Sequence, residues 1–202
     1  MPKTTLSARQ VQTPSRRRWI KLGAWAAGAT AAAGVAGTGV WMYQPDNDRQ
    51  LVFATLEQAM QEVDRLSAAG ARALEPATAW SWSQTLEHCA QSIEFSLHGF
   101  PAPKAALFQH TAGAAAFAAF AALGRMRHSL AEPIPGAPAL AAAAPDASAT
   151  LARLRQAVQD FVAHPGPLQP HFAYGPLGRT QYEQAHAMHL ANHLSAFDVC
   201  PG

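Results

Sequence analysis

Three histidines near the C-terminus are the residues whose type and spacing could do chemistry. His186, His189 and His193 lie in the stretch TQYEQAHAMHLANHLSAF, residues 180–197. On a helix, the last two would share one face about a turn apart, so both could reach a single metal ion. Apolar residues recur beside them at core spacing, which predicts that this face points inward. A buried histidine needs partners for its ring nitrogens, and a metal ion is one such partner.

A histidine pair four residues apart also occurs on polar helix surfaces and in hydrogen-bonded cores, so a third ligand would strengthen the metal interpretation. His88, on the flank of the apolar stripe of another predicted helix, is the obvious third ligand. His186 lies about 10 Å along the helix axis from His193, too far to share one ion comfortably. We interpret His186 as a neighbour of the ligands or as part of the entrance. His98, His128 and His164 are expected not to bind the metal.

Helices must position these residues, and the apolar periodicity predicts five of them. The helix of residues 80–97 is capped by Ser81 or Ser83 and ended by Gly99, and a Thr180–Glu183 capping box starts the last helix. Residues 129–145 and 164–178, rich in proline, alanine or glycine, are predicted loops. No strand pattern or nucleotide-binding motif is present, so the fold class is all-α. The other predicted helices span residues 52–66, 103–126 and about 146–164.

The first 45 residues have the pattern of an export signal. Residues 1–21 carry six basic side chains and no acid, and residues 22–43 carry no charge. The run from Ser15 to Lys21, SRRRWIK, resembles the twin-arginine signal. The uncharged run could be cleaved after a small residue, or it could span a bilayer and anchor the protein. We therefore expect contact with the twin-arginine export machinery, and a location in the periplasm or at the outer face of the inner membrane.

Residues 46–202 form one predicted domain behind this signal or anchor. The chain of 202 residues has 15 basic and 13 acidic side chains, but the six basic residues of the signal leave the domain with a net charge of about −4. The domain therefore gives no support to nucleic-acid binding. Gln109, His110 and Thr111 make residues 103–126 too polar for a second membrane span.

The order of these elements resembles the DinB/YfiT-like superfamily. The resemblance lies in WSWSQTLEHCAQSIEFSLHGFP, residues 80–101, together with the H-x-x-x-H pair near the C-terminus. Within the superfamily, the first stretch is similar to a domain-of-unknown-function family, number 1569. The resemblance implies a four-helix bundle with three histidine ligands to a divalent metal. Carried over to this chain, the ligands are His88, His189 and His193.

Three neutral imidazoles would leave the ion, which could be zinc, nickel, iron or manganese, with an open position for water or a small-molecule substrate. Some relatives in the superfamily that the chain resembles transfer small thiols, while the domain-of-unknown-function family has no assigned reaction. An open site also suits hydrolysis, so one interpretation is an exported metal-dependent enzyme. The alternatives are a non-catalytic metal-binding or interaction protein, and structural histidines. Glu87 and Glu94 are expected to be solvated. Cys89 and Cys200 could form a disulfide, although two unpaired thiols are the more ordinary state.

Overall fold

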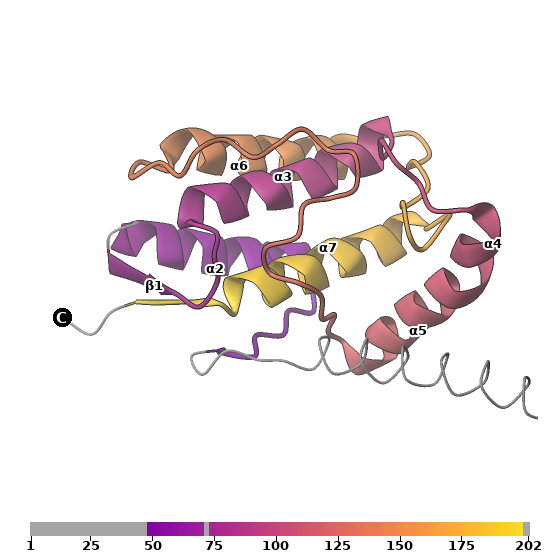
Figure 1. The fold of residues 1–202 in the computed structure, drawn as a ribbon, viewed down its shortest axis with the longest axis horizontal. Helices are drawn as coiled ribbons and strands as arrows, with labels where there is room; N and C mark the ends of the chain where they lie inside the picture. Colours follow the sequence, from indigo (N-terminus) through magenta and orange to yellow (C-terminus); the bar gives the residue numbers. More distant parts are fainter. Residues whose placement is uncertain (1–47, 71–72, 200–202) are drawn as a thin grey trace, which may run out of the picture. The chain divides into compact units, whose positions relative to one another are not determined.

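Helices make up most of the part of the chain that the computed structural model describes, residues 48–70 and 73–199. This part falls within a compact unit, Gln44–Gly202, while the predicted signal or anchor lies outside the described residues. The all-α prediction is confirmed. In chain order the elements are α2 Leu56–Ala69, β1 Leu74–Pro76, α3 Trp82–His98, α4 Ala106–Phe108, η2 Gln109–Gly113, α5 Ala114–Leu123, α6 Ser148–Ala163, α7 Arg179–Leu194 and β2 Phe197–Val199 (Figure 1).

Local sequence signals fix both ends of α2 and α3. The Thr55 side chain accepts a hydrogen bond from the backbone of α2, and α2 ends at Gly70. Ser81 and Gln84 form a capping box at the start of α3, as the sequence suggested for Ser81. Gly99, with φ of 105°, follows the end of α3 in a conformation that favours glycine.

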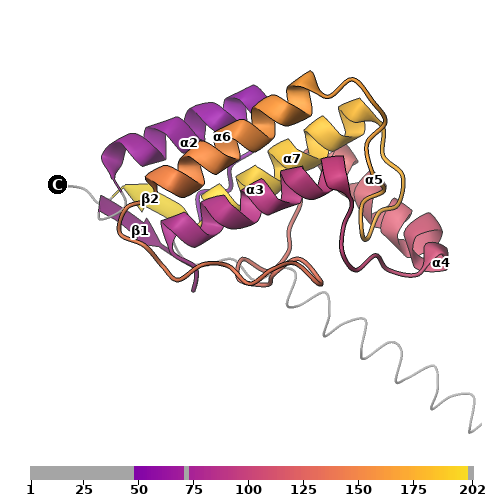
Figure 2. The same cartoon turned by 90° about the horizontal axis from the view of Figure 1, so that it is seen from above.

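The main core lies among α2, α3, α6 and α7, which run side by side (Figures 1 and 2). Each helix turns apolar residues at three- and four-residue spacing toward this core. The periodicity also predicted Val52 and Val162 as inward residues, but both are exposed. The apolar stripe of α3 beside His88 is buried: Leu86, Ala90, Ile93 and Leu97. Trp82 packs edge-on against Phe197 at 5.2 Å between ring centroids, so the chain after α7 also closes this core.

The two short strands were not predicted from the sequence. β1 and β2 pair antiparallel, with Leu74 opposite Val199 and Pro76 opposite Phe197. Three residues are too few to show the two-residue alternation that identifies a strand. Because β2 begins at Phe197, α7 ends at Leu194 and not at Phe197 as the sequence analysis expected.

The segment predicted as one helix over residues 103–126 is helical from Ala106 to Leu123 but contains a π-helical turn, η2. In that turn the Gln109 side chain donates hydrogen bonds to the carbonyls of His171 and Phe172. Gly113 lies so close to the same segment that an added Cβ would be 1.9 Å from the Ala173 carbonyl oxygen. The turn therefore seats residues 171–173 against this helix.

The predicted loop over residues 129–145 runs along the outside of α3. Its backbone donates from Ala141 to Glu87 and from Ala144 to Ser83, and Gln91 of α3 donates to the Pro138 carbonyl. Side chains of α3 thus replace the regular backbone pairing that a proline-rich segment cannot make. The surface-loop prediction is confirmed.

Candidate metal centre

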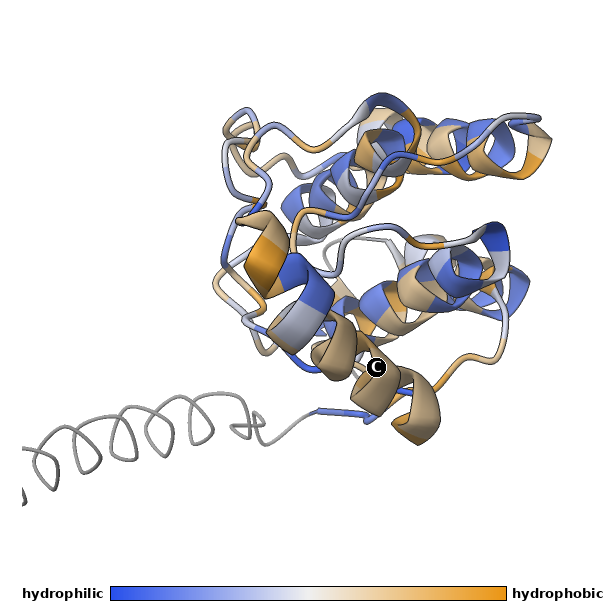
Figure 3. Ribbon diagram, turned by 90° about the vertical axis from the view of Figure 1, so that its right-hand side faces the viewer, coloured by the Kyte–Doolittle hydropathy of each residue, from blue (hydrophilic) through white to orange (hydrophobic). Residues whose placement is uncertain are grey.

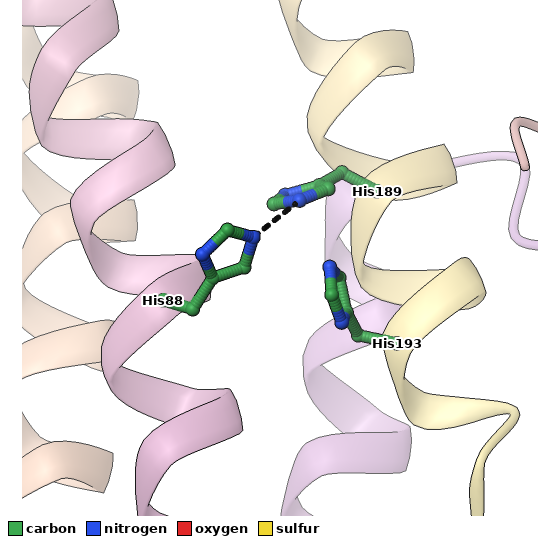
Figure 4. Close-up of side chains that lie close together, drawn as sticks. All are labelled: His88, His189 and His193. Atoms are coloured by element: carbon green, nitrogen blue, oxygen red, sulfur yellow. Dashed lines mark hydrogen bonds between the residues drawn. The ribbon is translucent and has the colours of Figure 1, made fainter. Parts of the chain in front are cut away.

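The structure brings His88, His189 and His193 together in the interior. His88 projects from α3 toward α7, where His189 and His193 lie one above the other, and the three rings face one another (Figure 4). Each offers one ring nitrogen, and these atoms all lie within 4.8 Å of one another. All three side chains are buried, with exposed fractions of 2%, 9% and 1%. Residues more than a hundred positions apart in the chain therefore form one cluster.

The spacing of these nitrogens suits a shared ion. The Nε2 atoms of His88 and His189 are 3.2 Å apart. Two nitrogens each about 2.0–2.1 Å from one tetrahedral ion would lie about 3.3 Å apart. The Nε2 of His193 is buried and has no hydrogen-bond partner. An unpartnered buried nitrogen beside two others is costly, and a shared cation would satisfy all three. The donor set therefore fits a divalent metal.

Helix α7, which carries His189 and His193, does not begin at the predicted residue. The helix begins at Arg179, and the Gln181 side chain accepts a hydrogen bond from the Gly178 backbone. The predicted Thr180–Glu183 capping box is therefore wrong, because Gln181 caps the helix at Gly178, two residues before Thr180. The pairing of His189 with His193 is unaffected, since it depends only on their spacing.

Burial keeps the three imidazoles neutral. Burial, together with the smaller effect of charge on His128, lowers the pKa of His88 to about 3. Burial also places the pKa values of His189 and His193 well below the ordinary histidine value, with neighbouring histidines as the next cause. A neutral imidazole has the lone pair that a metal needs. The rings are therefore in the ligand form at neutral pH.

His128 is a fourth histidine at this centre, although the sequence analysis set it aside. Its ring stacks on His189 and lies edge-on to His193, with both pairs of centroids 5.0 Å apart. The Nδ1 of His128 lies 2.9 Å from the Ser129 carbonyl, which can only accept, so Nδ1 carries the proton and Nε2 the lone pair. Asn192 of α7 donates to the His128 carbonyl and ties the segment in place.

Trp80 covers another side of the cluster and was also missed as a site residue. Its ring centroid is 4.7 Å from that of His88, and it stacks on His193 at 5.9 Å. Trp80 precedes the Ser81 cap, so it lies outside the regular part of α3 and its direction follows no helical spacing. An indole against two imidazoles keeps water from one side of the rings.

His186 is a core residue whose charge also acts on the pKa of His189, but its ring has partners of its own. Its Nε2 lies 3.2 Å from the Ser96 hydroxyl, and its ring contacts Tyr182 and Phe161. His171 builds a turn: its Nδ1 accepts from the backbone of Ala173 and Tyr174. Each of these buried histidines has its own partners, which leaves the ligand role to the cluster.

The carboxylates nearest His88 in sequence are engaged elsewhere. Arg153 of α6 donates two hydrogen bonds to Glu94 and a third to Glu87. The prediction that both carboxylates are only solvated is therefore wrong, because they form an ion-pair network between α3 and α6. Cys89 is a free, buried thiol, and burial raises its pKa. Cys200 lies outside the described residues, as does the proposed disulfide.

Comparison with known proteins places the domain in a family. Residues 46–199 match the family model described as "Protein of unknown function (DUF1569)". Searches of curated proteins and of solved structures gave no match. The matched region contains every residue of the cluster, from Trp80 to His193.

Proposed function

The chain belongs to the DUF1569 family, and we propose that it is an exported, divalent-metal-binding protein that acts as a metal-dependent enzyme. The observation that carries the proposal is the convergence of three buried, neutral imidazoles whose nitrogens lie within 4.8 Å of one another. We assign the ligands as His88, His189 and His193, and zinc, nickel, iron or manganese as the ion.

The DinB/YfiT-like four-helix bundle is the fold that we propose for the domain. It is supported by the shared core of α2, α3, α6 and α7, and by ligands that come from two facing helices. The export signal of residues 15–21 supports a periplasmic protein, or one anchored to the outer face of the inner membrane.

A bound divalent ion would supply an electrophilic position for a carbonyl or a thiol. Around that position, Trp80 excludes water from one side of His88 and His193. His128 presents the lone pair of Nε2, and its Nδ1 proton is held by Ser129. The unprotonated Nε2 of His128 would be available to accept a proton from a substrate held beside His189 and His193. This arrangement supports transfer of a small thiol or hydrolysis of an ester-like substrate.

Turnover by the metal-loaded full chain tests the enzymatic role. Thiol adducts and activated esters should be converted by the wild type and by a His98→Ala control, whose side chain is exposed. The His193→Ala variant should lose the activity, because the ion is no longer held. Conversion at wild-type rate by His193→Ala would contradict the proposal.

Non-catalytic metal binding is the second candidate, and the charge environment favours it. The charges that bear on the pKa values of His88, His189 and His193 all belong to other histidines, and none to a carboxylate. Among residues 48–70 and 73–199, no carboxylate therefore acts on the cluster as a general base would. Stoichiometric metal without turnover of either substrate class would support this candidate over the enzyme.

A further inference from the structure

The helical segment from Ala106 to Leu123 exposes a mostly apolar face, with His110 and Thr111 as its exposed polar residues. Its buried side is a narrow stripe of Gln109, Gly113, Phe117 and Phe120. Outside that stripe, every residue from 112 to 123 is alanine or leucine. Three of the five exposed large hydrophobic residues of the described chain lie on this segment: Leu107, Phe108 and Leu123. In Figure 3, which views this side of the molecule, α5 is hydrophobic along its length.

The segment is also long and apolar enough to cross a membrane, contrary to the sequence expectation, although it is held to the domain along one side. Phe117 and Phe120 pack with Ala185 and Met188 of α7, and η2 holds residues 171–173. A helix attached in this way can lie on a bilayer surface but cannot span it alone.

The charged residues within this segment and next to it in the sequence are all basic. No aspartate or glutamate occurs between residues 95 and 131. Exposed Lys104 and Arg125 flank the helical segment, and the Lys104 ammonium lies 5.3 Å from the Phe108 ring centroid. Basic ends beside an apolar face suit anionic headgroups. A second copy of the chain would instead bring basic ends near basic ends with no acid on the face to pair with them.

The described chain begins near the C-terminal end of α5. Asp48 lies 3.9 Å from Arg127, and Val52 lies next to Gly124, where α5 ends. The uncharged residues 22–43 could span about 33 Å as a helix, enough to cross a bilayer. If they anchor the chain, only four residues separate Tyr43 from Asp48, a reach of about 15 Å.

We propose that the exposed face of residues 106–123 docks on the lipid surface of the membrane in which the N-terminal segment is anchored. This inference rests on the anchoring part of the proposed function and is independent of the metal. It adds a second membrane contact, made by the domain itself.

Spin labels on the full chain can test this docking. We would replace Cys200 with Ser and introduce one labelled cysteine at a time, Leu107→Cys or Leu123→Cys. The labelled protein would be reconstituted in vesicles of phosphatidylethanolamine and phosphatidylglycerol. Val162→Cys on α6 is the matched control, because Val162 and Leu123 have exposed fractions of 68% and 67%. A label at Gly34→Cys reports separately on the N-terminal anchor.

If the face docks, the ratio of the label's collision rate with oxygen to its collision rate with a polar nickel complex should be several-fold higher at positions 107 and 123 than at position 162. The label at position 162 should stay exposed to water. Equal values at 107, 123 and 162, with Gly34→Cys in the bilayer, would overturn the docking but not the anchor. If the labels at positions 34 and 123 both lack the bilayer signal, the docking and the N-terminal anchor are both overturned. Spin–spin broadening at 107 or 123 without the rise in oxygen collisions would show a face between two copies, which also overturns the proposal.

Discussion

The candidate metal centre consists of imidazoles that the interior keeps neutral. His88, His189 and His193 are buried among one another, and no described hydrogen bond satisfies His193 Nε2. Such a cluster is unfavourable for an unliganded core, because each polar nitrogen loses water without a full set of partners. A function that uses these lone pairs accounts for the arrangement better than a structural role does.

His128 should be separable from the three ligands. We expect His128→Ala to keep the metal, because three imidazoles remain, and to lose most of the turnover, because Nε2 no longer accepts a proton. Metal content and rate measured on the same sample check this expectation. A loss of metal comparable to that of His193→Ala would instead make His128 a ligand.

Sequence reasoning identified the three clustered histidines because their positions follow from helical periodicity. His189 and His193 share a face by spacing alone, and His88 lies on the flank of an apolar stripe. His128 and Trp80 could not be found in this way. Both lie in irregular segments, whose paths depend on tertiary contacts such as Asn192 with the His128 carbonyl.

Among the elements, α3 and α6 are joined by one arginine. Arg153 pairs with Glu94 through both carboxylate oxygens and also reaches Glu87. The bidentate geometry makes this pair stronger than a single surface contact, although the Arg153 side chain is 40% exposed.

Replacing Arg153 with Gln should lower the free energy of unfolding by about 1 kcal/mol, because partly buried Glu87 and Glu94 lose their partner. The matched control is Arg155→Gln, which removes an exposed pair with Asp64. That control should change stability by less than about 0.5 kcal/mol. Urea unfolding followed by circular dichroism measures both, and equal losses would contradict the assigned difference.

Element types were easier to predict than element ends. The helices over residues 82–98 and 148–163 match their periodicity. The first helix starts at Leu56 and not at residue 52, because Thr55 caps it, and α7 starts at Arg179 because Gln181 reaches the Gly178 backbone. Strands of three residues carry no periodic signal. The π-helical turn follows from contact with residues 171–173, which local sequence does not encode.

For the whole molecule, buried histidines link stability to pH. Burial lowers the pKa values of His171 and His186 to about 3, whereas an unfolded histidine titrates near its ordinary value of 6.5. Between these values the unfolded chain binds protons that the folded chain does not. The contribution of these histidines to the free energy of unfolding should therefore be complete above pH 6.5, and the free energy of unfolding should decrease as the pH drops toward 3.

The expected slope is about 1.4 kcal/mol per pH unit for each such histidine. Urea unfolding between about pH 7.5 and pH 5 measures it. His186→Gln should reduce the slope by the contribution of one histidine. His98→Gln, at an exposed position, should leave the slope unchanged. Stability that is constant or rises on acidification would refute the linkage.

Export is a further property of the full chain, proposed from residues 15–21. Replacing Arg16 and Arg17 with Lys should leave the protein in the cytoplasm, because the twin-arginine pair is the feature that the export machinery reads. Fractionation of cells expressing both forms measures this. Unchanged delivery to the periplasm or membrane would reject that route.

The metal content of the native, untagged chain tests the central claim most directly. We predict about one divalent ion per chain for the wild type and for the His98→Ala control. His88→Ala, His189→Ala and His193→Ala should each retain less than about a tenth of it, because two imidazoles bind far more weakly than three. Elemental analysis after gel filtration gives the number. A wild type without metal, or full occupancy after His88→Ala, would contradict the account.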